Sequence, residues 1–204
     1  DQAARVERDP ASTLRARALA KLDVADVDAP VAFVLSHCQA DAARLESGLF
    51  EDYYAWLVAT LDVAREVTDR TWVVRFHPWY RMFREGPVVE RIKAAYGGCR
   101  HIRFDDAVLT KDEYFSACDL AVTVRGTAAW ELGRWAIPVI AAGRSWYERA
   151  GFVHAPATIA DYEALLRRPV ADLAAPADGP RAALSFAAYT MLLLPLSSPL
   201  CPPR

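Results

Sequence analysis

The fold is decided by residues 119–143, which read DLAVTVRGTAAWELGRWAIPVIAAG. Residues 120–124 form an apolar run rich in β-branched side chains, which is typical of a buried strand. Residues 125–127 interrupt that run, and residues 128–132 are good helix formers. A second apolar run, residues 139–142, follows a proline. The stretch therefore predicts a strand–loop–helix–strand unit, which is the building block of a parallel sheet.

The loop of this unit, Arg125-Gly126-Thr127, falls where a strand's carboxyl end meets a helix amino terminus. Open α/β sheets bind ligands at that edge, and free N–H groups there favour anions such as phosphate. Gly126 would let the backbone approach a ligand, Thr127 could cap the helix or bond a phosphate oxygen, and Arg125 adds a planar cation. An ordinary tight turn, with Arg125 paired to an acid such as Asp119, explains the same residues. Glu131 shares a helix face with Thr127, but the helix dipole alone could account for its position.

The rest of the chain repeats the alternation of strand and helix. Apolar runs read as strands at residues 31–36, 71–76 and 101–104, and periodic segments read as helices at residues 49–67, 88–96, 111–118 and 159–168. The pattern predicts a Rossmann-like, doubly wound and mostly parallel α/β sheet. We expect an amino-terminal helix and linker over residues 1–29, a Rossmann-like domain over 30–168, and a connector with an apolar helix over 169–204.

Three predicted strands end in polar side chains: Ser36-His37, His77-Pro78 and the Arg125 loop. In a parallel sheet all three endings lie on one edge, so we expect them to converge. His77 could bind phosphate there or donate to a backbone carbonyl. His37 and Asp41 are weaker candidates, because a core-edge histidine and a loop aspartate explain them nearly as well. The helical stripe of Tyr53, Tyr54 and Trp56 reads as core packing.

Composition limits the classes of function. Of the 204 residues, 53% are hydrophobic, which supports a sizeable core, and the net charge of −2 gives no electrostatic case for nucleic acid. The four cysteines contain no C-x-x-C pair, so we expect no metal site and no disulfide framework. Cys38 and Cys118 read as reduced, buried thiols, which fits a cytoplasmic protein. No Walker loop or nucleophile elbow is present.

Three stretches resemble the capsule polysaccharide biosynthesis glycosyltransferases, the family that includes Kdo transferases. They are SHCQAD with LFEDYYAWLVATL (residues 36–61), WVVRFHPWY (72–80) and VTVRGTAAWELGRWAIPVIAAGRSWYERAGF (122–152). The resemblance covers roughly residues 31–165. It implies one half of a GT-B enzyme, the carboxy-terminal half that binds a nucleotide-sugar donor, with the acceptor-binding half expected before Asp1.

The resemblance also implies roles for single residues. His77, with Pro78 beside it, and Thr127 would hold the phosphate of a CMP-activated keto sugar, and Glu131 would face the ribose or base. Transfer to a glycan or glycolipid acceptor would need no further cofactor. The sequence departs from the family where Phe76 intervenes before His77, and where no Pro-His pair follows Asp41, the local candidate for a catalytic base.

Two other functions fit the same pattern. The chain could be a non-catalytic module of a polysaccharide export complex, docking on a partner or on the inner-membrane surface through residues 182–196. It could also be part of a nucleotide-sugar epimerase, whose active site would likewise need two halves.

Overall fold

A computed structural model of the chain describes residues 13–24, 26–41, 45 and 48–193. Its centre is a sheet of five parallel strands in the order β3-β2-β1-β4-β5. The strands are β1 (Val31–Leu35), β2 (Thr71–Arg75), β3 (Ile102–Asp105), β4 (Leu120–Thr123) and β5 (Val139–Ala141). This arrangement confirms the predicted Rossmann-like, doubly wound sheet.

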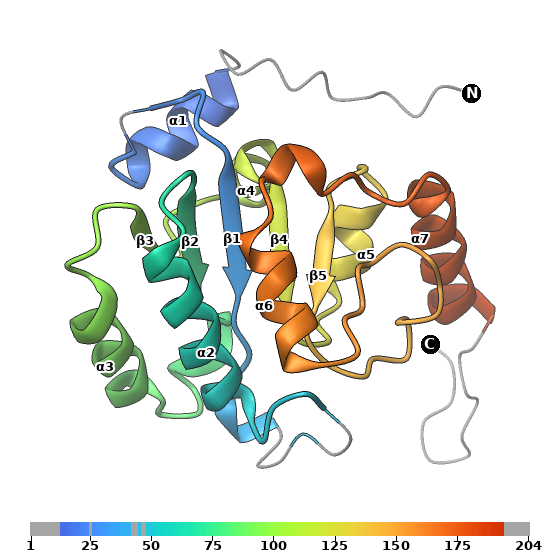
Figure 1. Cartoon of the computed structure of the whole chain (residues 1–204), viewed down its shortest axis with the longest axis horizontal. Coiled ribbons are helices and arrows are strands. Elements are labelled where there is room, and N and C mark those ends of the chain that lie inside the picture. Colours follow the sequence, from blue (N-terminus) through green and yellow to red (C-terminus); the bar gives the residue numbers. More distant parts are fainter. Residues whose placement is uncertain (1–12, 25, 42–44, 46–47, 194–204) are drawn as a thin grey trace.

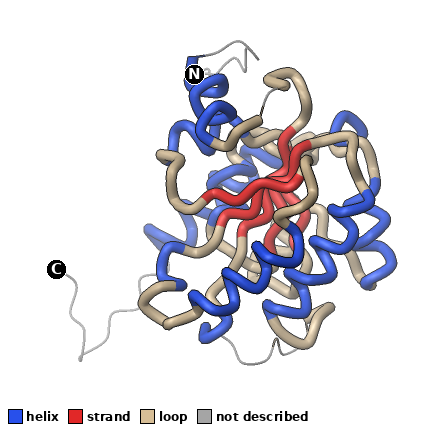
Figure 2. The backbone as a smooth tube through the Cα atoms, turned by 90° about the vertical axis from the view of Figure 1, so that its left-hand side faces the viewer, coloured by secondary structure: helices blue, strands red, loops and turns tan. Residues whose placement is uncertain are grey.

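Helices cover both faces of the sheet (Figures 1 and 2). One face carries α2 (Tyr53–Glu66), α3 (Gly86–Tyr96) and α6 (Ile159–Arg167), and the other carries α1 (Thr13–Lys21), α4 (Lys111–Ala117), α5 (Ala128–Gly133) and α7 (Gly179–Ala188). Alternate strand residues feed the two cores: Val34, Val74 and Val122 point to the first, and Phe33, Val73 and Ala121 to the second. Because both faces are covered, the strands read as continuous apolar runs.

Shorter helical turns complete the chain. They are the 3₁₀ turns η1 (Gln39–Asp41), η2 (Pro78–Tyr80) and η3 (Val170–Asp172), and the π-helical turn η4 (Tyr189–Leu193) that continues α7.

Helix boundaries differ from expectation where a cap decides them. Helix α2 begins at Tyr53 and not at residue 49, because the extended Asp52 accepts a 2.7 Å hydrogen bond from the N–H of Ala55. Thr158 caps α6 by accepting a hydrogen bond from the N–H of Asp161. The apolar helix expected over residues 182–196 is present as α7 and η4, with residues 194–196 outside the described part of the chain.

Helix α7 packs on its own domain with one side only. Ala183 is buried in the core of the second face, and the Phe186 ring lies 5.7 Å from that of Phe152. Leu184, on another side, is 59% exposed. In the described residues, no helix combines the length and apolarity needed to cross a membrane.

A buried ion pair joins α1 to the amino ends of the two central strands. Arg15 is 5% exposed, and its guanidinium lies 2.9 Å from the carboxylate of Asp119, just before β4. The same carboxylate accepts a 2.9 Å bond from the N–H of Val31, the first residue of β1. Arg15 also donates to the carbonyls of Val27, Ala29 and Ala117. The alternative in which Asp119 pairs with Arg125 is therefore wrong.

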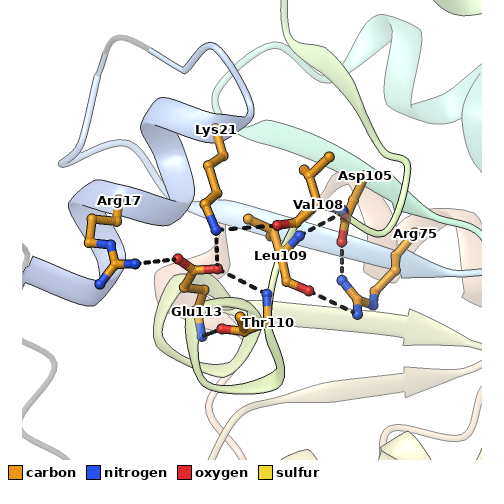
Figure 3. Close-up of polar contacts among 8 residues, drawn as sticks. All are labelled: Arg17, Lys21, Arg75, Asp105, Val108, Leu109, Thr110 and Glu113. Atoms are coloured by element: carbon orange, nitrogen blue, oxygen red, sulfur yellow. Dashed lines mark hydrogen bonds and ion pairs between the residues drawn. The ribbon is translucent and has the colours of Figure 1, made fainter.

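A second polar network ties the connection between β3 and α4 to its surroundings (Figure 3). Glu113 is buried and closes a capping box with Thr110 at the start of α4. Lys21 of α1 donates to its carboxylate at 2.7 Å, and this bond, followed by the Thr110 N–H, lowers the pKa of Glu113 to about 2. On the other side of the loop, Arg75 pairs with the buried Asp105, which also accepts the N–H groups of residues 108 and 109.

We expect Arg15→Met to lower the free energy of unfolding by roughly 3 kcal/mol, because it removes the guanidinium that lies 2.9 Å from the partly buried carboxylate of Asp119. Urea denaturation would measure the change. As a control, Arg181→Met breaks a pair whose side chains are both 80% exposed, and it should cost less than about 0.5 kcal/mol. Similar losses in the two variants would contradict the anchoring role of Arg15.

Candidate functional site

The candidate site lies at the carboxyl ends of β1, β2 and β4, where the loops that follow β1 and β4 lead to opposite faces of the sheet. The chain leaves β1 toward α2 on one face of the sheet and leaves β4 toward α5 on the other. Since β1 and β4 are neighbours, this is the topological switch point at which open α/β sheets bind ligands. Two of the three predicted polar endings, after β1 and β4, flank it, and the third follows the adjacent β2.

His37 bridges the two central strands. Its Nε2 lies 3.1 Å from the hydroxyl of Thr123 at the end of β4, and its ring stacks on Tyr53 with centroids 4.4 Å apart. Burial, followed by the nearby His77 and Arg125, lowers the pKa of His37 to about 4. His37 is therefore neutral at pH 7 and acts as a packed hydrogen-bonding group.

Tyr53 joins this arrangement from the first turn of α2. Its hydroxyl accepts a 2.8 Å bond from Nε of Arg125, whose guanidinium carbon lies 5.6 Å from the centre of the Tyr53 ring. The sequence interpretation placed Tyr53 in the helix core and missed this role. The signal that could have found it is positional: the helix after β1 begins at the ligand-binding edge of the sheet, so a side chain in its first turn can reach the switch point.

His77 is held in one tautomer by its neighbours after β2. Its Nδ1 accepts a 3.3 Å bond from the N–H of Trp79 and lies 3.2 Å from Sγ of Cys38. An atom that accepts from a backbone N–H carries no proton, so the neutral ring bears its proton on Nε2. In the part of the chain that the structure describes, no group bonds to that Nε2. The main-chain N–H of His77 donates to the hydroxyl of Ser36, which fixes the start of the turn.

Gly126 allows the loop after β4 to approach His37 closely. A Cβ on Gly126 would lie 3.0 Å from Oγ1 of Thr123 and 3.4 Å from Cε1 of His37. From the other side, the buried Tyr147 donates a 3.0 Å bond to the Gly126 carbonyl, which helps to fix the shape of this loop. The glycine is needed here for close packing of the loop against the protein's own side chains.

The remaining predicted residues lie around this centre. Thr127 stands at the amino end of α5, but its exposed side chain makes no capping bond, so the capping alternative is wrong. Glu131 pairs with Lys111 of α4 at 2.7 Å. Pro78 opens η2 and is exposed, and Asp41 is exposed at the end of η1.

Two other histidines serve the scaffold. His101 and His154 bond the carbonyls of Ala64 and Ala174, at 2.9 Å and 3.1 Å. Across the described residues, no group of three histidine, cysteine or acidic side chains is placed to hold a metal ion.

Comparisons with known proteins show what this fold is shared with. No protein-family model matches the sequence, and no curated protein matches it as a relative. Among solved structures, HepE from Anabaena in complex with UDP is 13% identical with a TM-score of 0.53, over 86% of this chain and 48% of that one. The wall teichoic acid polymerase TagF is 10% identical with a TM-score of 0.56, over 85% and 42% of the two chains.

A third structure is the UDP-GlcNAc 2-epimerase from Neisseria meningitidis bound to UDP-GlcNAc, with 12% identity and a TM-score of 0.54 over 92% of this chain and 51% of that one. At these identities the likeness establishes the fold, the Rossmann-like unit expected for one half of a GT-B protein. The chain spans about half the length of these structures.

We expect the neutral His37 to make the fold sensitive to mild acid. The unfolded chain takes up a proton near the ordinary histidine pKa of 6.5, whereas folded His37 does so only near pH 4. The free energy of unfolding should therefore fall as the pH drops from about 6.5 to about 4, after which this contribution levels off. Glu113 acts in a lower window, between about 4.5 and 2.

Urea denaturation at a series of pH values would test this expectation against His37→Phe, which keeps an aromatic ring beside Tyr53 but does not titrate. The variant should show a shallower fall between pH 6.5 and 4. Burial also lowers the pKa of His154, and that contribution stays in both proteins. An identical pH dependence in the two would refute the assignment to His37.

We expect Gly126→Ala to destabilise the domain by about 1–3 kcal/mol, because the added methyl group must displace Thr123 or His37. A matched variant is Gly98→Ala, whose Cβ would meet nothing within 4 Å and which should be neutral or slightly stabilising. Thermal denaturation of both would measure the difference. Equal effects would show that the close approach at Gly126 carries no cost.

Proposed function

We propose that the chain is the donor-binding half of a glycosyltransferase and that it holds the phosphate of a nucleotide sugar at the switch point. One observation carries the proposal: His77 presents a proton-bearing Nε2 with no partner among the described residues, at the ligand-binding edge of a Rossmann-like sheet. A donor held in this way is suited to a phosphate oxygen, on which charge develops as the sugar departs.

The loop after β4 supplies further donors in this proposal. The Thr127 side chain is exposed and makes no capping hydrogen bond to α5, so its hydroxyl is available to a phosphate oxygen. Arg125 uses Nε to bond Tyr53, which orients the rest of its guanidinium, the part that would contact the ligand. Glu131 would face the ribose after exchanging Lys111 for the ligand's hydroxyl groups. Pro78 sets the turn that aims the His77 ring.

The finer identity of the donor rests on the sequence resemblance. It supports a CMP-linked keto sugar similar to CMP-Kdo, transferred to a glycan or glycolipid during capsular polysaccharide synthesis in the cytoplasm. The structures that share the fold include HepE with UDP and the epimerase with UDP-GlcNAc, so uridine nucleotides are the competing donors to test.

Acceptor activation is a further part of the proposal. Asp41 is the local candidate for the base that deprotonates the acceptor hydroxyl, since it is exposed at the end of η1, the turn that follows Cys38. In the two-half architecture the acceptor would be bound by a preceding Rossmann-like half, and the reacting atoms would meet between the halves.

Calorimetric titration of the chain with CMP, UDP and GDP would test the proposal. We expect one nucleotide to bind, and we expect His77→Ala and Thr127→Val each to weaken it about tenfold or more, because each removes a hydrogen bond to a charged group. His101→Ala is the matched control, since His101 precedes β3 at the opposite edge of the sheet and bonds a backbone carbonyl. Unchanged affinity in both site variants would contradict the proposal.

Two alternatives make different predictions. A nucleotide-sugar epimerase would convert its donor sugar without any acceptor, which the fold shared with the UDP-GlcNAc 2-epimerase makes worth measuring. A non-catalytic module would bind no nucleotide and would dock through the outward side of α7 and η4, where Leu184, Tyr189 and Met191 are 59%, 52% and 62% exposed.

A further inference from the structure

The thiol of the buried Cys38 contacts His77, the residue proposed to bind phosphate. Cys38 lies in the loop after β1, it is 0% exposed, and its Sγ is 3.2 Å from Nδ1 of His77 in the loop after the neighbouring β2. A cysteine in a core is ordinarily a small apolar residue. This one makes its polar contact with Nδ1 of His77, the ring nitrogen other than the Nε2 proposed to bind the ligand.

The direction of the hydrogen bond follows from the second partner of Nδ1. The N–H of Trp79 donates to the same atom at 3.3 Å, so Nδ1 is an acceptor and the thiol must be the donor. Burial, followed by Glu85 and Asp41, raises the pKa of the Cys38 thiol to about 11, so its proton is present at neutral pH. Cys38 thus gives Nδ1 a second donor, in addition to the Trp79 N–H of η2.

We infer that Cys38 is a positioning residue that holds His77 in the tautomer with its proton on Nε2, the atom available to a ligand oxygen. The effect of Cys38 on the His77 tautomer does not depend on the proposed function; only its effect on nucleotide binding rests on that function. Without the thiol, Nδ1 would keep one long bond to Trp79, and the ring could rotate or carry its proton on the wrong nitrogen. Ser36 would still fix the backbone of His77, so the loss would concern the ring alone.

Nitrogen-15 NMR of the four histidines would test the tautomer directly, without any nucleotide. The signals of His77 are identified by their absence in His77→Ala. We expect the proton on Nε2 in the wild type and in Cys38→Ser, which keeps a hydroxyl donor. In Cys38→Ala we expect a mixture of the two tautomers. The same Nε2 tautomer in Cys38→Ala, or a proton on Nδ1 in the wild type, would overturn the inference.

Cys118→Ala is the matched control, because Cys118 is also 0% exposed but bonds the carbonyl of Leu120 at the other end of the sheet. It removes the same group from an equally buried site and should leave the His77 signals unchanged. A shift of those signals in Cys118→Ala equal to that in Cys38→Ala would mean that general loosening, and not the thiol, is responsible, and would also overturn the inference.

Nucleotide titration of the same variants gives the functional consequence. Affinity should fall about threefold to tenfold in Cys38→Ala and recover in Cys38→Ser, as expected for one indirect hydrogen bond. If the wild type binds no nucleotide, the proposed function fails while the NMR comparison still decides the role of Cys38. If the wild type binds and Cys38→Ala binds equally well, the thiol does not position His77 for binding.

Discussion

The parallel pairing of β1 with β4 is the constraint on which the rest of the structure depends. In this register Phe33 of β1 lies opposite Ala121 of β4. On the other side of β1, Phe33 lies opposite Val73 of β2. Because the chain leaves the two central strands toward opposite faces, their polar endings meet with no helix between them. Arg15 and Asp119 secure this pairing at the amino edge, where one carboxylate receives both the guanidinium and the first N–H of β1.

The carboxyl edge is built from neutral polar groups more than from charges. Burial keeps His37 neutral, and its Nε2 forms a hydrogen bond with the Thr123 hydroxyl. The Cys38 thiol keeps its proton beside His77. Such groups are costly to bury only when unpaired, and here each is paired within the row that runs from β2 through β1 to β4. In the proposed function, the donors that would meet a ligand at this edge are those of the half-buried His77 and Arg125 and the exposed Thr127.

The fold was predictable, and a candidate site could be proposed, because both depend on local patterns. Apolar runs of strand length, alternating with helical periodicity, predict a doubly wound sheet, and the five strands are found where the runs occur. The polar endings after three of those runs identified His37, His77 and the Arg125 loop. Their contacts were not predictable, since Tyr53 and Cys38 read as core residues until the helix and strand that carry them are placed beside the loop.

The sequence by itself determined the class of fold and the strand ends that carry polar side chains, because residue type and spacing along the chain decide both. It predicted a close approach of a ligand at Gly126, whereas the structure packs Gly126 against Thr123 and His37. Only the tertiary structure decided which partner each side chain takes. Asp119 bonds Arg15 across 104 residues, Arg125 bonds Tyr53 across 72, and Cys38 reaches His77 across 39. Such pairings follow from the strand order of the sheet, which no local pattern encodes, so hydrogen-bond direction and the tautomer of His77 become visible only once the chain is folded.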